Sequence, residues 1–295
     1  MTALTQLQFD RRARIEVFNG TERLEVSDLR IRITIVKTLL GYPNRGTVEV
    51  YNLADESVQR ITKKFSTIRV FAGYAGSVKQ IYEADVFNFF KSRQSPDSVF
   101  TFITSSGSRS WEQSVFSRSY RKGTSVQTIL EEVAGSFDGT QIGSIQINPE
   151  WSPLLKNATL SGGSASIMNN LSRTYNFDWF VDQNELHVVP RGMALNDKGI
   201  YDLSVDNGLI GSPTLTELGC DFRMLMNPDV LPGRLLRMTS EFVQLGQAGL
   251  EFRRVRTIAD GVYKVMETRL VNDTRGSDWY GDIIGWRQGD EPRKE

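Results

Sequence analysis

The chain has a single histidine, His187, and a single cysteine, Cys220, and these two residues are the first candidates for chemistry. One histidine rules out paired-histidine metal motifs and leaves one candidate general base. His187 alternates with Leu186 and Val188 in a run that ends at Pro190, which is typical of a structural residue in a strand. The residues around Cys220 show no nucleophile elbow or helix N-terminus that could activate a thiol, so we expect a small core residue.

Carboxylates offer a second route to chemistry. A pair of Asp or Glu side chains can hydrolyse glycosides, and only their three-dimensional spacing identifies such a pair. The candidates are Glu112, which follows Trp111, and the adjacent Glu131 and Glu132. Glu131 and Glu132 fall on the polar side of an amphipathic helix, which favours a solvated face. The segment 273–278 has two spaced acids but lacks the third acid and closing glutamate of a calcium loop, so we expect a turn.

Glycine-rich and basic motifs also have structural interpretations. The sequence Ser161-Gly162-Gly163-Ser164 lacks the Lys-Ser/Thr pair of a phosphate-binding loop and is interpreted as the loop that enters a helix. The basic runs 11–14 and 253–256 are expected to be solvated strand faces or partners in ion pairs. We therefore predict no catalytic residue, no cofactor and no metal site, and we do not expect an enzyme.

The elements in the first third of the chain are predicted to be mostly strands. Residues 29–35 alternate apolar and polar side chains with the period of two that marks a half-buried strand. Pro43, Asn44 and Gly46 suit the turn that follows, and residues 54–61 suit a short helix with acids in its first turn. Strands are expected over residues 29–35, 47–51, 66–74, 80–91 and 99–104.

The middle of the chain combines helices with a hairpin. Thr124-Ser125 precedes apolar residues at helical spacing, which predicts a capped helix that ends near Gly135. A second helix is predicted to begin near Ser164. It leads into a hairpin of residues 177–181 and 185–189, so this module is α+β.

The last third returns to strands. Residues 221–226 are expected to form a strand whose return strand is 234–240, and residues 261–271 and 278–285 a second hairpin. The first and last thirds share this layout, which suggests an internal duplication. The predicted parts of the chain are residues 1–105, 106–200 and 201–295.

Bulk composition limits the classes of function. The 295 residues suffice for two or three domains, and 35 basic and 35 acidic residues cancel, so no global field attracts nucleic acid or an anionic membrane. Residues 1–10 lack the apolar core of a signal peptide, and no apolar run approaches a membrane span, so we expect a soluble protein made in a cytoplasm. The single cysteine excludes an intrachain disulfide and fits a reducing compartment.

A series of short motifs follows one order along residues 29–285. In chain order the motifs are Val48-Glu49-Val50-Tyr51-Asn52-Leu53, Ala72-Gly73-Tyr74, Ile81-Tyr82-Glu83-Ala84-Asp85-Val86, Gly123-Thr124-Ser125-Val126, Gly211-Ser212-Pro213-Thr214, Met226-Asn227-Pro228, Pro232-Gly233, Gly261-Val262-Tyr263-Lys264-Val265, Asn272-Asp273-Thr274-Arg275-Gly276 and Trp279. Each is weak alone, but in this order they resemble the baseplate hub proteins of contractile-tailed bacteriophages, including the Mu-like group. The acidic Glu83-Ala84-Asp85 departs from the glycine-bearing strand of many such hubs.

The resemblance implies a structural, non-enzymatic virion protein of the tail baseplate, assembled in the bacterial host cytoplasm. It implies a predominantly β, α+β fold, with tube-like β-barrel or sandwich domains at 1–105 and 201–295 and a peripheral α+β module at 106–200. Such hubs form homotrimers, and two tube-like domains per subunit give a pseudo-sixfold ring that joins the tail tube to the central spike.

Several partners follow from this resemblance. They are the central spike protein, the tail tube and tape-measure proteins and the baseplate wedge proteins, while DNA would pass through the lumen only in transit. A smooth conduit should bind DNA weakly, which is compatible with a net charge near zero. No stable membrane association is expected.

Three alternatives stay open. The chain could be the hub of a phage-derived contractile injection or secretion machine, or a cell-wall hydrolase carried on the baseplate. It could also be a glycan-binding protein that uses Trp111, Trp151 and Trp179, although such aromatic residues are more often core. A hydrolase site would lie in residues 106–200, where no catalytic constellation is visible.

Overall fold

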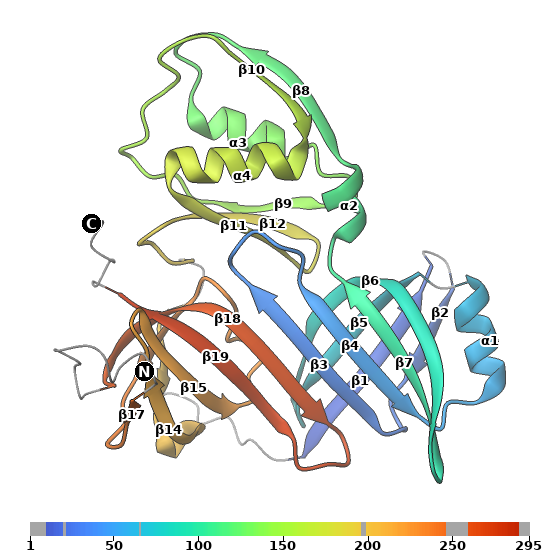
Figure 1. The fold of residues 1–295 in the computed structure, drawn as a ribbon. Helices are drawn as coiled ribbons and strands as arrows, with labels where there is room; N and C mark the ends of the chain where they lie inside the picture. The colour runs from blue at the N-terminus through green and yellow to red at the C-terminus, as the bar shows by residue number, and fades with distance from the viewer. Residues whose placement is uncertain (1–9, 20–21, 65, 196–198, 246–258, 289–295) are drawn as a thin grey trace.

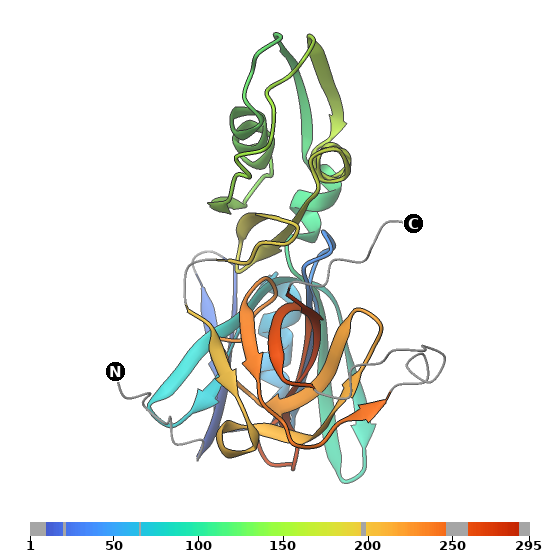
Figure 2. The same cartoon turned by 90° about the vertical axis from the view of Figure 1, so that its left-hand side faces the viewer.

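The computed structural model describes residues 10–19, 22–64, 66–195, 199–245 and 259–288, and the basic run 253–256 lies outside them. These residues form a large sheet with an α+β module above it (Figure 1). The view turned by 90° shows the module projecting from one end of the sheet (Figure 2). None of the helices among the described residues has the length and apolarity needed to cross a bilayer.

The first part of the chain is mostly strands. Its elements are β1 (Arg11–Phe18), β2 (Arg23–Val26), β3 (Ile31–Thr38), β4 (Arg45–Tyr51), α1 (Asp55–Lys64), β5 (Thr67–Tyr74), β6 (Ser77–Gln94) and β7 (Asp97–Ser105). The predicted strands and helix are confirmed. β1 contains the basic run 11–14, which was expected to be a strand face or a set of ion-pair partners, whereas β2 was not predicted. In β1 the side chains of Ala13, Ile15 and Val17 face the core and alternate in the sequence with Arg14 and Glu16.

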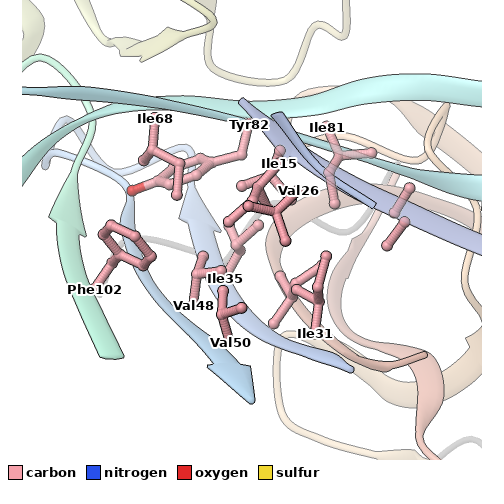
Figure 3. Close-up of a cluster of buried hydrophobic side chains, with 14 of the residues drawn as sticks. Ile15, Val26, Ile31, Ile35, Val48, Val50, Ile68, Ile81, Tyr82 and Phe102 are labelled. Carbon is pink, nitrogen blue, oxygen red and sulfur yellow. The ribbon is translucent and has the colours of Figure 1, made fainter. Parts of the chain in front are cut away.

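Alternate burial along these strands produces one hydrophobic core (Figure 3). On β3 the side chains of Ile31, Ile33 and Ile35 are fully buried, while the residues between them are not. Burial of each such side chain stabilises the fold by about 1.5–3 kcal/mol. The same core contains Leu270 and Trp279 from the last part of the chain, so the first part does not complete its core alone.

The middle of the chain forms the α+β module that the sequence predicts. Its elements are α2 (Ser108–Gln113), β8 (Val115–Tyr120), α3 (Val126–Ala134), β9 (Gln141–Ile145), β10 (Ala158–Gly163), α4 (Ser164–Tyr175), β11 (Phe177–Asp182) and β12 (Glu185–Pro190). The cap of α3 is confirmed, because the Ser125 side chain accepts a hydrogen bond from the Thr128 backbone N–H at 3.1 Å. The strands form two small sheets, β8-β10 and β9-β12-β11.

One prediction in this module is wrong. Ser161 to Gly163 belong to β10, which pairs with β8 and runs directly into α4, so they are not a loop. Gly162, within this strand, has a φ of 142°, a backbone conformation that side-chain-bearing residues rarely adopt.

The last part of the chain returns to strands. Its elements are β13 (Tyr201–Leu203), η1 (Val205–Asn207), β14 (Leu209–Leu215), β15 (Gly219–Leu225), β16 (Leu235–Met238), β17 (Gln244–Leu245), β18 (Gly261–Asp273) and β19 (Trp279–Arg287). The predicted β18–β19 hairpin is confirmed. The predicted return strand is not: β16 pairs with β13 and β18, whereas β15 pairs with β14 and β19.

The first and last parts share one sheet. β3 pairs antiparallel with β18, so that Arg32 lies opposite Asp273 and Thr38 opposite Glu267. The resulting order is β17-β14-β15-β19-β18-β3-β4-β7-β6-β5-β1-β2. The predominantly β fold is therefore confirmed, while the division into two tube-like domains with boundaries near 105 and 200 stays a prediction.

Candidate functional site

His187 and Cys220 lie in different parts of the molecule. His187 is a residue of β12, and its Nδ1 accepts a hydrogen bond from the backbone N–H of Ser144 at 3.0 Å. Cys220 is fully buried in the core beneath β15 and β19, and burial raises the pKa of its thiol to about 12. The predicted roles as strand residue and core residue are confirmed.

The candidate carboxylates of the module differ in their surroundings. Glu112 on α2 and Glu131 on α3 are exposed, which confirms the solvated face predicted for Glu131. Glu132 does not fit that prediction, because it is half-buried, accepts a hydrogen bond from the Tyr120 hydroxyl at 2.6 Å and pairs with Arg118 at 2.9 Å. Burial and this hydrogen bond raise the pKa of Tyr120, so Glu132 anchors β8 to α3.

Asp273 confirms the turn predicted at 273–278. Its carboxylate accepts hydrogen bonds from the backbone N–H groups of Arg275 and Gly276 at 3.0 and 2.9 Å, and pairs with Arg30 at 2.6 Å. Burial alone would raise the pKa of Asp273, but these partners together hold it below its usual range. Within the described residues, no group of three or more His, Cys, Asp or Glu side chains is placed to hold a metal ion.

The module joins the sheet through buried ion pairs. Asp182 on β11 accepts a hydrogen bond from the Lys37 ammonium of β3 at 2.6 Å, and both side chains are almost fully buried. Asp178, on the same strand, contacts Lys264 of β18 at 3.3 Å and Arg191 at 3.0 Å. Burial lowers the pKa of Lys264, although Asp178 opposes that shift. One strand of the module thus holds one lysine from each end part of the chain.

These pairs were not predicted, although the sequence contains a signal for one of them. Lys37 continues the inward phase of Ile31, Ile33 and Ile35, so its position alone indicates a buried ammonium. A buried lysine requires an opposite charge. The position of that partner, 145 residues further along the chain, cannot be read from the sequence.

The turn between β3 and β4 also contacts the module. Asn44 donates a hydrogen bond to the Val181 carbonyl at 2.9 Å, and Gly41, with φ of 67°, lies so close to Trp179 that a Cβ would be 3.0 Å from its ring nitrogen. Trp179 is buried and stacks on Trp111 with ring centroids 4.7 Å apart. Trp151 packs against the same core, so the core role of these aromatic residues is confirmed.

The sheet has an outer face whose charges alternate. One cross-strand row runs over β14, β15, β19 and β18 and consists of Ile210, Arg223, Asp282 and Arg269. Within this row Arg223 pairs with Asp282 at 2.7 Å. We call this surface the outer face; its charged members on β3, β4, β15, β18 and β19 are Arg32, Arg45, Glu49, Asp221, Arg223, Glu267, Arg269 and Asp282. Figure 1 shows these strands side by side across the front of the molecule.

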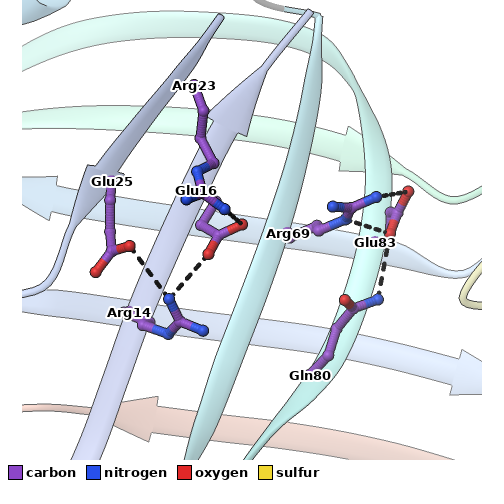
Figure 4. Close-up of polar contacts among 7 residues, drawn as sticks. All are labelled: Arg14, Glu16, Arg23, Glu25, Arg69, Gln80 and Glu83. Atoms are coloured by element: carbon purple, nitrogen blue, oxygen red, sulfur yellow. Dashed lines mark hydrogen bonds and ion pairs between the residues drawn. The ribbon is translucent and has the colours of Figure 1, made fainter. Parts of the chain in front are cut away.

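A second polar cluster lies on β1, β2, β5 and β6 (Figure 4). Arg14 on β1 pairs with Glu16 at 2.9 Å and with Glu25 at 3.2 Å. Arg69 on β5 pairs with Glu83 on β6 at 2.6 Å. In the basic run 11–14, Arg12 and Arg14 have ion-pair partners, as predicted, and Arg11 donates hydrogen bonds to the backbone carbonyls of Gly276 and Ser277. The run 253–256 lies outside the described residues.

Comparisons with known proteins relate this geometry to one family and one fold. A family model described as baseplate hub gp41 matches residues 12–244. The sequence has no match among curated proteins.

Solved structures of tail proteins share the fold. A tail protein from Neisseria meningitidis MC58 is 9% identical with a TM-score of 0.60, and the match covers 95% of this chain and 98% of that one. The 43 kDa tail protein of prophage MuSo2 from Shewanella oneidensis is 7% identical with a TM-score of 0.62, covering 95% and 99%. A component of the Escherichia coli type VI secretion system is 9% identical with a TM-score of 0.55, covering 88% and 74%.

Proposed function

This chain belongs to the baseplate hub gp41 family and is a structural protein of the phage tail baseplate, and from that premise we propose that three copies form its central ring. The ring is a homotrimer in which the first and last parts of each subunit alternate, giving pseudo-sixfold symmetry. One face of the ring meets the tail tube and the other meets the central spike. Tape-measure protein and then DNA pass through the lumen.

The observation that carries this proposal is the single sheet that joins the two end parts of the chain. Its outer face crosses the β3–β18 boundary without interruption, as the wall of a conduit requires. Arginines and acids alternate on this face, so a passing polyanion meets little net attraction. The opposite side of the sheet carries the hydrophobic cores.

The module stands at the periphery in this arrangement, where it is available to the wedge proteins of the baseplate. Its attachment supports that placement, because Asp178 and Asp182 hold it against the end of the sheet at β3 and β18 and leave the outer face uncovered.

The mass of the purified protein in solution tests the proposal. Light scattering behind a sizing column should give about three times 33.3 kDa, and electron microscopy of that species should show a ring with six similar lobes. If the protein alone is monomeric, co-expression with the spike should produce the trimer. A dimer or tetramer at every concentration, or a monomer even with the spike, contradicts the ring.

We also propose that the protein is not an enzyme. Glu112 and Glu131 are exposed, and Glu132 is engaged by Tyr120 and Arg118, so none is held as a catalytic pair. Purified protein should release no fragments from peptidoglycan. Lytic activity that is lost in Glu112→Gln or Glu131→Gln would overturn this assignment.

A second candidate is the equivalent hub of a contractile injection machine, which the similarity to the type VI secretion component supports. The fold and ring would be the same and the payload different. Mass spectrometry of DNA-containing particles from the producing strain separates the two, since a phage hub is recovered with capsid proteins and an injection-machine hub is not.

A further inference from the structure

The module contains a two-stranded ribbon, β8-β10, that pairs with no other strand in the described part of the chain. In Figure 1 the ribbon lies at the end of the module furthest from the large sheet. One of its faces packs on the module core through Phe116 and Leu160. Because side chains alternate along a strand, the other face is exposed and carries small hydroxyl groups. Its members are Ser117, Ser119, Thr159 and Ser161.

The hydrogen-bond pattern of the ribbon shows which backbone groups point away from it. Just beyond the paired strands, the backbone N–H of Ser164 donates to the carbonyl of Ser114 at 2.9 Å. Hydrogen-bonded pairs alternate along an antiparallel ladder, so Thr159 and Ser161 belong to the pairs that do not bond within the ribbon. The 2.9 Å contact between the hydroxyls of Ser119 and Thr159 agrees, since side chains lie closer in such pairs. The N–H and C=O groups of Thr159 and Ser161 therefore point outward along the free edge of β10.

This edge lacks the features that usually protect an exposed strand. Charged side chains, proline or a bulge normally block pairing with another chain. Strand β10 has no charged residue and no proline, and its register with β8 is unbroken. Other edge strands differ, since β2 carries Arg23 and Glu25, β8 carries Arg118, and β9 has a register shift against β12. The edge of β10 is thus open to a further strand.

We propose that the free edge of β10 takes up an extended segment of another protein of the tail baseplate, which becomes the third strand of the ribbon. The inference rests on the proposed function, which places the module at the periphery of the ring. The added strand hydrogen-bonds to the outward backbone groups of Thr159 and Ser161. Main-chain bonds of this kind provide affinity, and the alternating side chains provide specificity.

The chemistry of the edge defines the segment. Half of its side chains lie on the core side, next to the half-buried Leu160, and are apolar. The other half continue the exposed hydroxyl face and are small and polar. Strand β10 has no charge that could pair with a charged residue of the partner. The partner is therefore an uncharged segment that alternates apolar and small polar residues over a length similar to the six residues of β10.

Symmetry argues against a second copy of this chain as the occupant. Two identical edges that pair antiparallel are related by a twofold axis, which a ring of three subunits does not contain. Pairing between copies in different rings would join the rings into larger assemblies. A segment of a different protein covers each of the three edges without either consequence.

Photocross-linking in assembled tails identifies the occupant. Benzoylphenylalanine in place of Thr159 or Ser161 should couple this chain to one other tail protein under ultraviolet light. Mass spectrometry should place both couplings on one uncharged, alternating segment, about two residues apart, because both side chains lie on one face of the ribbon. The same group in place of Ser117, on β8, is the matched control and should not couple to that segment.

Proline substitution removes the edge donors and leaves the ladder intact. Ser161→Pro and Thr159→Pro each delete an outward N–H, at a position where an edge strand tolerates proline. Tails assembled with either variant should retain about tenfold less of the coupled protein, because its carbonyl loses a donor. Ser117→Pro and Ser119→Pro make the same change on β8 and should retain it. Light scattering of each purified variant should match wild type, which shows that the variant folds.

The outcomes separate the inference from the proposed function. The edge assignment is overturned if intact tails give no coupling from either position of β10, or equal coupling from Ser117. Coupling between two copies of this chain, or full retention of the partner in both β10 proline variants, also overturns it. Each of these results leaves the ring standing. If the wild-type protein forms no trimer, alone or with the spike, the ring itself fails.

Discussion

Asp178 and Asp182 lie four positions apart on β11, yet they hold lysines from opposite ends of the chain. Both carboxylates and both ammonium groups are buried. A buried charge without a partner is costly, so each aspartate fixes the place where its lysine can lie. Residue types that suggest chemistry in the sequence therefore have structural roles in this protein. Ordinary charged residues, by contrast, join the module to the sheet.

The thiol of Cys220 should be inert in the folded protein. With its pKa raised to about 12 by burial, the thiolate fraction at pH 8 is about 10⁻⁴. Iodoacetamide should therefore label native protein very slowly and unfolded protein rapidly, as mass spectrometry can follow. Rapid labelling of the native chain at pH 8 contradicts the burial of this residue.

Asp273→Asn should lower stability at neutral pH. The folded-state pKa of Asp273 is depressed, so its contribution is present above the unfolded carboxyl pKa of about 4 and is lost as the pH falls through the folded value. Urea unfolding at pH 7 should show a loss of about 1–3 kcal/mol. The difference from wild type should shrink at pH 3. Asp206→Asn, at an exposed position, is the control and should change little at either pH.

At the scale of elements, β11 acts as a clamp on the sheet. It pairs with β12 inside the module, and its two aspartates contact β3 and β18 where those strands leave their shared ladder. The turn between β3 and β4 adds Asn44 and the contact of Gly41 with Trp179. Positioning of the module therefore depends on a few buried polar contacts as well as on packing.

Lys37→Met should destabilise the protein by about 3–5 kcal/mol, because Asp182 would stay buried without its partner. The double variant Lys37→Met/Asp182→Leu should recover most of this loss, since neither charge is then buried. Chemical denaturation measures both. The exposed pair of Arg237 and Asp202 provides the control, and Arg237→Met should cost no more than about 1 kcal/mol. A double variant as unstable as the single one contradicts this account.

At the scale of the whole molecule, the outer face spans both end parts of the chain with balanced charge. Arginines on β3, β15 and β18 lie beside acids on β4, β15, β18 and β19. The sequence has no net charge, but that total does not show how the charges are arranged. The sheet places opposite signs next to one another, which cancels the field near the surface as well as far from it.

DNA should bind the wild-type protein weakly, with a Kd above about 10⁻⁴ M at 0.15 M salt. The triple variant Glu49→Lys/Asp221→Lys/Asp282→Lys makes the outer face basic and should bind at least tenfold more tightly, with a steeper salt dependence. Fluorescence anisotropy with a labelled duplex measures both. Tight binding by the wild-type protein contradicts a smooth conduit.

Local patterns in the sequence determined much of the element list. Alternation predicted β3 to β7, helical spacing with the Thr124-Ser125 cap predicted α3, and Asp273 to Asp278 predicted the turn of the β18–β19 hairpin. The order of the short motifs pointed to the baseplate hub family. These signals are readable because each depends on neighbours within one strand, helix or turn.

Tertiary structure alone decided which strands are neighbours. β3 pairs with β18 across more than two hundred residues of sequence. β16 pairs with β13 and β18 and not with β15, and Lys37 forms an ion pair with Asp182 of the module. No short window contains such pairings, because they depend on which edges and buried charges remain unmatched once the local elements have formed.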